Sequence, residues 1–322
     1  MLIVLSESLR TRDLRAPLAP PVRDALLNLS TAAYEGKHLL AGTRLLFGDL
    51  QQLPALGPVT AGRFKEASTV TAEALALRDS VTALIRVEPV GSTPSFEHLT
   101  TATGVAQFVF HLPLDHFADS ARVGSSCLVG EHLRDVTTYI ALAEAVAVRS
   151  PYRGLRCTLR AVDGHGGETH QTFLLSTEQE GAVLCIVDSD RADASSPLGS
   201  TATKLLSCCD GVWVRDKAAV VHVLPCRELE NLLPAKLVLD AVPTDPKDTL
   251  RNQVVSQQHR LGLADFAELK HLVKLPQISE HLRKLTPMKR AEAYFSEPIP
   301  PALREVSTLA WSFGLAPRRG RT

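Results

Sequence analysis

The sequence has no run of the about 18–20 apolar residues that a membrane-spanning helix needs, so we expect no membrane contact. It shows no secretory signal either, because the apolar stretch in MLIVLSESLRTRDLR is short and charged residues follow it at once. None of the six cysteines belongs to a CxxC pair, which excludes the commonest zinc and thiol-redox motifs. Several cysteines lie in apolar runs such as VLCIV, where a free thiol behaves as a small hydrophobe. These absences predict a reducing, cytoplasmic location.

The chain as a whole has no excess of either charge. Its 35 basic and 35 acidic residues give a net charge of zero, which excludes a histone-like or membrane-coating protein. A composition of 45% hydrophobic and 22% charged residues is that of a folded protein, not a disordered one. The charge is nevertheless unevenly divided: residues 247–322 hold 13 Lys and Arg against 7 Asp and Glu, leaving 22 basic and 28 acidic residues elsewhere. A basic tail after an acidic body indicates that the tail faces a polyanion.

With 322 residues, the chain is long enough for one large domain or for two to three ordinary ones. LIVLS at the start predicts a short buried strand, and apolar residues at helical spacing follow over 22–53, with a break at Gly36. A second helix is expected over about 61–78. The alternating runs VTALIRVEP and VAQFVFHLPL then predict two strands separated by the turn-rich GSTPS segment. We therefore expect residues 1–118 to form an N-terminal α+β domain with its own apolar core and no catalytic constellation.

Residues 122–242 have a different sequence pattern. Apolar runs alternate with helical patterns there, and the runs lie at 125–131, 155–168, 182–190 and 217–231. Because these strands are apolar on both faces, they predict an α/β domain with a parallel sheet flanked by helices. In such sheets, functional groups gather just beyond the carboxyl ends of the strands. Residues 243–322 are mostly amphipathic and are cut by several prolines, so we expect a helical C-terminal region.

Acids follow two of the predicted strands of the middle domain. Glu131 ends the first, while Asp188 and Asp190 end another with i, i+2 spacing, which in an extended segment directs both carboxylates to the same side. Asp135 lies one helical turn after Glu131. A group of carboxylates beyond parallel strands is costly unless a hard divalent cation neutralises it, and Mg²⁺ prefers such oxygen ligands. The pattern therefore predicts a magnesium site.

Each acid taken alone is better explained by an ordinary structural role, because Asp is a good turn residue and a good helix N-cap. What favours the metal hypothesis is the order strand–Glu–helix, strand–Gly-Gly–helix, strand–DxD. The glycines at 164–167 are interpreted as a turn rather than a nucleotide site, since the lysine and spacing of a P-loop are missing. His132, His165 and His170 lie near these elements, either as solvated loop residues or as a general base.

The segments GEHLRDVTTY, HGGET and IVDSD, in this order over about 60 residues, resemble a Toprim domain. This is the metal-binding module of topoisomerases, bacterial primases, recombination mediators and overcoming-lysogenisation-defect nucleases. Glu131 and Asp135 match the glutamate and second acid of the family's first motif, and Asp188 and Asp190 match its DxD. The Gly166–Gly167 turn corresponds to the small-residue turn after its second strand. Here Gly130 precedes the glutamate, whereas many members place the glycine after it.

A further segment, PCRELENLLP at 225–234, resembles the stretch after the DxD in Toprim-like proteins of bacterial phage-defence systems. By that resemblance Glu228 or Glu230 is an additional metal-site acid, and Asn231 is a structural or phosphate-contacting amide. The resemblance covers roughly residues 122–242. It implies Mg²⁺ or Mn²⁺ as the cofactor, with these metal ligands: Glu131, Asp135, Asp188, Asp190 and Glu230.

The resemblance implies metal-dependent cleavage of phosphodiester bonds in DNA or RNA, as by the effector of a phage-defence system, with Glu131, Asp188 and Asp190 as catalytic residues. The basic C-terminal helices would follow the nucleic-acid backbone without reading its sequence. A solvated helix face explains these charges equally well. The candidate nucleic-acid-binding residues are Lys270, Lys274, Arg283, Lys284, Lys289 and Arg290.

A non-catalytic role is the alternative: a Toprim-like scaffold or interaction subunit that binds a protein partner in a defence complex, with oligomerisation left open. The sequence lacks an obvious catalytic tyrosine, which argues against a topoisomerase, and it lacks a zinc ribbon, which argues against a bacterial primase. Sensitivity to a chelator and to substitution of Asp188 distinguishes a nuclease from a scaffold.

Overall fold

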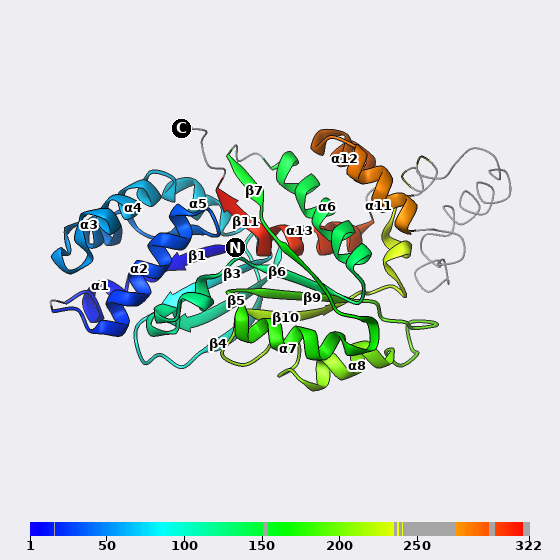
Figure 1. The fold of residues 1–322 in the computed structure, drawn as a ribbon, viewed down its shortest axis with the longest axis horizontal. Coiled ribbons are helices and arrows are strands. Elements are labelled where there is room, and N and C mark those ends of the chain that lie inside the picture. Colours follow the sequence, from blue (N-terminus) through cyan, green and yellow to red (C-terminus); the bar gives the residue numbers. More distant parts are fainter. Residues whose placement is uncertain are drawn as a thin grey trace.

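The computed structural model describes residues 1–15, 17–150, 154–234, 237, 240, 275–295 and 300–317. Within them the strands form two larger sheets, one built from residues 2–113 and the other from residues 127–223, and a third, two-stranded sheet. In Figure 1 the first sheet and its helices lie on the left and the second sheet lies at the lower centre, with helices on both sides of it. The protein is therefore a mixed α/β structure whose larger sheets are rich in parallel strands.

The N-terminal sheet has the strand order β2-β1-β3-β5-β4, and every neighbouring pair is parallel except β4 with β5. Helices connect β1 to β2 and β2 to β3, whereas β3 leads through β4 to its parallel neighbour β5, so residues 1–118 form an α/β unit and not the α+β unit that we expected. The reason is the parallel pairing of β1 with both β2 and β3, which requires helical crossovers. The elements are β1 (Leu2–Leu5), α1 (Leu9–Arg12), α2 (Pro20–Tyr34), β2 (Leu39–Ala41), α3 (Arg44–Gln52), α4 (Gly57–Thr69), α5 (Thr71–Leu77), β3 (Ala83–Glu88), β4 (Ser95–Thr100) and β5 (Ala106–Pro113).

The helical pattern predicted over 22–53 is interrupted by a strand. Helix α2 ends at Tyr34, Gly36 has a positive φ of 67°, and Leu39 and Leu40 then belong to β2 and not to a helical stripe. The break at Gly36 is confirmed, since glycine adopts this backbone conformation without a steric penalty. Leu39 and Leu40 are both buried in the parallel pairing with β1. Two consecutive buried leucines fit a strand covered on both faces as well as a helix, which is why spacing alone misassigned them.

The second sheet has the order β10-β9-β6-β8, and all of its neighbouring strands are parallel, as the sequence predicted. Alternate side chains of its strands enter two separate hydrophobic clusters. Cys127 and Cys185 pack with Phe173 of α7, whereas Leu128 and Leu184 belong to the cluster on the side of α6. The sheet is thus covered on both faces. Its elements are β6 (Cys127–Gly130), α6 (Leu133–Arg149), β8 (Arg160–Asp163), α7 (Thr169–Gln179), β9 (Val183–Val187), α8 (Ser200–Ser207) and β10 (Ala219–Val223).

The described C-terminal helices pack against the rest of the molecule. Helices α11 (Leu275–Lys284), α12 (Pro287–Tyr294) and α13 (Pro301–Gly314) all contact α6, and α13 also contacts β3 of the first sheet. Phe313 of α13 lies edge-on to Phe110 of β5. Strand β11 (Leu315–Pro317) then pairs antiparallel with β7 (Leu155–Cys157) in the small third sheet.

A single hydrophobic cluster runs from β1 through α6 to α13, so the N-terminal sheet is separate but its apolar core is continuous with that of the second unit. Among the described helices, none is both long enough and apolar enough to cross a membrane.

Candidate active site

The strand order of the second sheet places Glu131 and Asp188 side by side. Strand β6 leads through α6 to β8 on one side, while β9 leads through α8 to β10 on the other, so the connections from the parallel neighbours β6 and β9 run in opposite directions along the sheet. Gly130 of β6 lies opposite Ile186 of β9 in parallel register. Glu131 and Asp188 therefore leave neighbouring strands at the switch point of the topology, which is where open α/β sheets bind their ligands.

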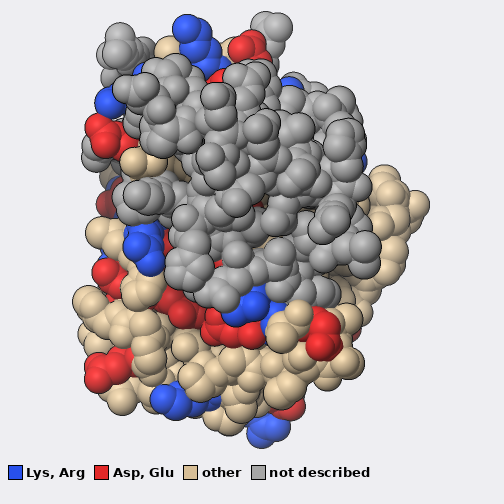
Figure 2. Space-filling model, turned by 90° about the vertical axis from the view of Figure 1, so that its right-hand side faces the viewer, with Lys and Arg blue, Asp and Glu red and all other residues tan. Residues whose placement is uncertain are grey.

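All four strands of this sheet are followed closely by an acid at the same edge. Asp163 ends β8, Glu131 follows β6, Asp188 follows β9, and Glu228 lies in the segment after β10. This carboxyl edge lies on the right of Figure 1, where α6 begins. Figure 2 views the molecule from that side and shows acidic side chains gathered there. The edge therefore concentrates negative charge.

Glycines hold Glu131 close to the sheet. A Cβ atom on Gly130 would lie 2.8 Å from Cγ2 of Val136, so only glycine lets α6 begin this close to the end of β6. The backbone N–H of Gly164 donates to the carbonyl of Gly130, and that of Gly166 donates to the carbonyl of Glu131, both at 2.8 Å. The glycine segment is a turn, as predicted, and it fixes the backbone at Glu131.

The DxD segment does not stay extended. Strand β9 ends at Val187, and Asp190 has a left-handed φ of 53°, so the pleat does not set the relative direction of the two carboxylates as the i, i+2 spacing predicted. The carboxylate of Asp190 lies instead against Gly199, the N-cap residue of α8, where a Cβ atom would come within 2.6 Å of Oδ2. Asp190 is solvent-exposed, whereas Asp188 is half-buried.

Hydrogen bonds tie the loop after β9 to the loop after β10. Oδ1 of Asp188 accepts from the backbone N–H of Leu229 at 3.1 Å, and Oγ of Ser189 donates to the carbonyl of Cys226 at 2.7 Å. The backbone N–H of Asp190 donates to the carbonyl of Arg227 at 3.1 Å. These three bonds fix the acids that follow the two strands relative to one another.

The segment after β10 forms a capped 3₁₀ helix, η5 (Leu229–Leu232). Glu228 is its N-cap residue, and Oδ1 of Asn231 accepts a hydrogen bond at 2.8 Å from the backbone N–H of Glu228. The resemblance implied that Asn231 is either a structural or a phosphate-contacting amide, and this hydrogen bond is a structural one. Glu228 and Glu230 are only 2% and 5% exposed. Buried carboxylates of this kind are costly without compensation.

Tyr139, which the sequence reasoning missed, lies beneath the acids. It is one helical turn after Asp135 on α6 and is 1% exposed. Burial raises the pKa of its hydroxyl well above the usual value, and the charges of Asp188, Asp135, Cys226 and Glu230 act in the same direction. A neutral phenol thus lies near carboxylates from α6, from the loop after β9 and from η5. The i, i+4 spacing of Asp135 and Tyr139 is the sequence signal for it.

Glu131 influences a different buried group, the Cys185 thiol of β9. Burial raises the pKa of the Cys185 thiol well above its usual value, and Cys209 and Glu131 add to this effect. The structure thus groups Asp135, Asp188 and Glu230 around Tyr139, with Glu131 on the neighbouring strand end and Asp190 turned towards α8.

The donor atoms at this edge are all carboxylate oxygens, the type that Mg²⁺ and Mn²⁺ prefer. Within the part of the chain that the structure describes, however, no three Asp, Glu, His or Cys side chains form a metal-ligating group. The acids therefore have the oxygen donors that a divalent cation prefers, and their backbone positions share one edge of the sheet. Their side chains, however, do not converge on one point.

The predicted nucleic-acid-binding residues divide into three groups. Lys284 is exposed and pairs with Glu280 at 2.9 Å, and Lys289 is exposed on α12. Arg290 is only 17% exposed: it pairs with Glu144 of α6, and its Nε donates to the carbonyl of Leu285 at 3.1 Å, so it joins α12 to α6. Lys270, Lys274 and the side chain of Arg283 lie outside the described residues.

Three arginines next to the acids were also missed by the sequence reasoning. Arg191 follows the DxD directly, Nε of Arg134 lies 3.6 Å from Oδ1 of Asp135, and Nε of Arg227 lies 3.6 Å from Oε1 of Glu228. Nearby, the His132 ring comes within 3.6 Å of the position that a Cβ atom on Gly166 would take. Arginine side chains outside the C-terminal tail thus border the acidic edge.

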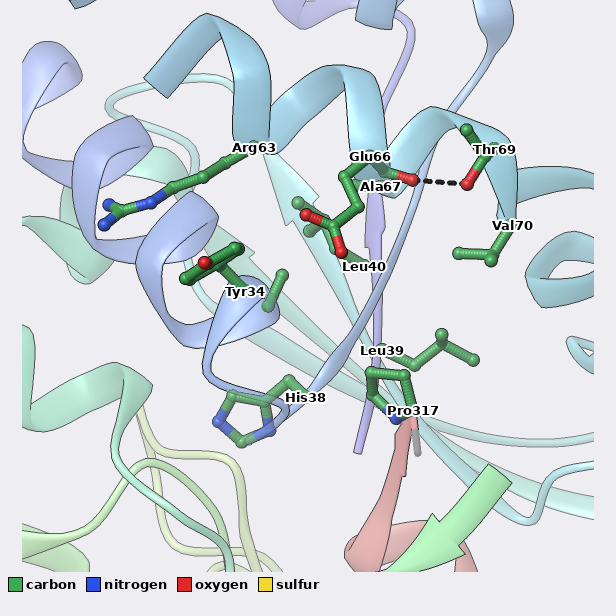
Figure 3. A pocket seen from close by; sticks show the side chains of 11 residues that line it. Tyr34, His38, Leu39, Leu40, Arg63, Glu66, Ala67, Thr69, Val70 and Pro317 are labelled. Atoms are coloured by element: carbon green, nitrogen blue, oxygen red, sulfur yellow. Dashed lines mark hydrogen bonds between the residues drawn. The ribbon is translucent and has the colours of Figure 1, made fainter. Parts of the chain in front are cut away.

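A separate pocket of about 170 Å³ lies in the N-terminal unit, between α2, β2, α4 and β11. Figure 3 shows Tyr34 and Glu66 beside it and Pro317 at its lower wall. The guanidinium of Arg63 stacks on the Tyr34 ring, 5.2 Å from its centroid. The described lining of this pocket includes none of the predicted metal ligands, so it is distinct from the acidic edge.

Comparisons with known proteins returned no match: no family model matches the chain, and neither a curated protein nor a solved structure does. The resemblance to Toprim domains therefore rests on the short sequence motifs alone.

Proposed function

We propose that the carboxyl edge of the second sheet carries out metal-dependent cleavage of phosphodiester bonds in nucleic acid. The observation that supports this most is the position of Glu131 and Asp188 on either side of the topological switch point, in a sheet whose four strands are all followed by acids. The motifs that resemble a Toprim domain fall on these same strand ends.

Glu131, Asp188 and Asp190 would hold one Mg²⁺ or Mn²⁺ once their side chains turn towards a common point, and Asp135 or Glu230 would serve a second. A bound divalent ion supplies Lewis acidity, offsets charge on a phosphate and lowers the pKa of a bound water. Tyr139 contributes a buried neutral hydroxyl among carboxylates that repel one another. The hydrogen bonds of the loops after β9 and β10 keep the acids in place while a substrate binds.

A polyanionic substrate needs positive charge near an acidic edge, because carboxylates repel phosphates. Arg134, Arg191 and Arg227 are each adjacent in sequence to one of the acids. We retain Lys284 and Lys289 as candidates on exposed helix faces, together with Lys270, Lys274 and Arg283. Arg290 is excluded from this role because it is engaged with Glu144.

The second candidate function is a non-catalytic scaffold that binds a protein partner, for example within a phage-defence complex. It is favoured by the structural use of the acids: Asp188 accepts from Leu229, and Glu228 caps η5. Strand-end acids with such roles need no metal.

A nuclease assay separates the two functions. Supercoiled DNA and total RNA are incubated with the protein and Mg²⁺ or Mn²⁺, with and without a chelator. We expect cleavage that requires the metal, that is lost in Asp188→Asn and that is kept in Asp210→Asn, an exposed acid paired with Arg215. Chelator-resistant cleavage, or none at all with either metal, contradicts the proposal. Binding of a protein partner that survives both chelator and Asp188→Asn supports the scaffold.

A further inference from the structure

A groove of about 460 Å³ lies in the N-terminal unit. Its volume is within the usual range for a small-molecule site. In the N-terminal sheet the connection from β1 leads to β2 on one side and the connection from β3 leads to β4 and β5 on the other, just as the connections from β6 and β9 diverge in the second sheet. Glu7 after β1, Thr43 after β2 and Arg86 on β3 all line the groove. It therefore extends to the switch point of this sheet, where ligands of α/β sheets bind.

The floor of the groove is the sheet face opposite α13. In the strand register Val4, Arg86 and His111 lie in one row across β1, β3 and β5. The next row holds Leu84, Val109 and Glu97, from β3, β5 and β4. Leu84 and Val109 are 4% and 7% exposed, so an apolar strip lies directly beside a polar row. Phe110, on the other face, packs on Phe313.

Glu88 holds the guanidinium of Arg86 from one side. Oε1 of Glu88 lies 3.0 Å from Nε of Arg86 and accepts a hydrogen bond at 3.1 Å from Nδ1 of His111. No other described residue pairs with the Arg86 guanidinium, and the side chain is 53% exposed. With Nε oriented in this way, the two terminal Nη groups form a fork that suits a carboxylate.

Glu97 lies on the far side of the imidazole. Its Oε2 is 3.5 Å from Nε2 of His111, and its side chain is 55% exposed. His111 itself is 13% exposed and is held between the two glutamates. It therefore acts as a rigid spacer that separates a cationic fork on one side from a carboxylate on the other.

The charges around the groove decide the class of ligand. Glu7 is engaged by Arg10 and by the hydroxyl of Thr43, and Arg78 pairs with Asp79, its neighbour in the chain, so each of these groups already has a partner. Arg86 is paired with Glu88 through Nε alone, and it lies with Glu88 on one side of the His111 ring while Glu97 lies on the other, so a cationic and an anionic group flank one imidazole. A simple anion would meet Glu97 uncompensated, and a simple cation would meet Arg86. A ligand with both charges satisfies each of them.

We propose that this groove binds a small zwitterion with an apolar body, such as an apolar amino acid or a short apolar peptide. The ligand carboxylate contacts the Arg86 fork, the ammonium contacts Glu97, and the apolar part packs on Leu84 and Val109. This site is independent of the metal chemistry proposed for the second sheet, and neither proposal depends on the other.

Isothermal titration of the full chain with three matched probes tests the site. L-leucine carries both charges, N-acetyl-L-leucine lacks the ammonium, and L-leucinamide lacks the carboxylate. We expect L-leucine to bind at least about tenfold more tightly than either of the others, which corresponds to about 1.4 kcal/mol. Equal affinity for the three probes, or no binding of L-leucine at millimolar concentration, overturns the proposal.

Two variants assign the contacts. Arg86→Gln should weaken L-leucine binding and remove its advantage over leucinamide, and Glu97→Gln should remove its advantage over N-acetyl-leucine. Both side chains are about half exposed, so both variants should fold, and thermal unfolding checks this. Arg215→Gln, at an arginine 75% exposed in the second unit, is the matched control. Unchanged L-leucine binding in both Arg86→Gln and Glu97→Gln would overturn the assignment.

Discussion

Oδ1 of Asp188 accepts a hydrogen bond at 3.1 Å from the backbone N–H of Leu229, so the acid at the end of β9 caps the 3₁₀ helix that follows β10. The same side chain is therefore both a predicted metal ligand and a structural link between two strand ends. Substitutions at Asp188 therefore change both the predicted metal binding and the stability of the fold, and the two effects have to be measured separately.

Asp188→Ala should lower the free energy of unfolding by about 1–2 kcal/mol, because Leu229 loses its acceptor in a half-buried loop. Asp188→Asn keeps an oxygen that can accept this bond, so it should lose much less stability while still losing the negative charge. Urea unfolding of the two variants measures the difference. Equal stability loss in both would show that the carboxylate charge, and not the hydrogen bond, supports the fold. Nuclease activity should be lost in both.

Gly130→Ala should destabilise the protein by about 1–3 kcal/mol, because the new Cβ would lie 2.8 Å from Cγ2 of Val136, a stiff β-branched side chain. Gly48→Ala is the matched control: Gly48 lies inside helix α3, and its Cβ would meet nothing within 4 Å. Since alanine favours helix over glycine, this control should gain up to about 1 kcal/mol. Thermal unfolding measures both. A neutral Gly130→Ala would mean that the start of α6 can shift.

His38 should make stability depend on pH. Burial is the main cause that lowers its pKa to about 3, while its Nε2 lies 2.8 Å from the carbonyl oxygen of Gly124. Below the ordinary pKa of about 6.5 the unfolded chain binds a proton here and the folded chain does not. The free energy of unfolding should therefore fall by about 2 kcal/mol between about pH 7 and about pH 5 from this residue.

His38→Gln keeps a donor for the Gly124 carbonyl and removes the titration. Its unfolding free energy, measured in urea, should fall less over the same pH range than that of the wild type. His116, whose pKa burial lowers to about 4, acts in the same direction, so the difference between variant and wild type isolates His38. Parallel pH profiles for the two proteins would contradict the assignment.

Asp13 should make the protein less stable as the pH rises, which is opposite to the effect of His38. Burial raises the pKa of Asp13, and the charge of Asp115 adds to this, against a hydrogen bond from the backbone N–H of Val90 at 3.3 Å and the charge of Arg12. Because the folded-state pKa is above the unfolded one, the folded chain holds the proton longer and its stability falls as pH rises through that range. Asp13→Asn should therefore be more stable than the wild type at neutral pH, with the difference vanishing in acid. Melting temperatures at several pH values test this.

The sequence by itself determined the second sheet and its acidic edge. Apolar runs such as Val183–Val187 are buried on both faces, so their composition already specifies a parallel strand between two helical layers. Since the carboxyl ends of parallel strands share one edge, Glu131 and Asp188 had to lie at the same edge. Gly36 and the glycine turn at 164–167 were also readable, because they depend on local backbone conformation.

Tertiary structure decided what local patterns cannot encode. Leu39 and Leu40 form a strand because β1 pairs with them, although their spacing also fits a helix. Arg290 is not available to nucleic acid because Glu144, far away in sequence, meets it. Asp190 leaves the strand direction through its left-handed backbone, and Arg86, His111 and Glu97 meet only through the register of three strands. Each of these depends on contacts between distant segments, whose energies exceed local propensity and appear only once the chain is packed.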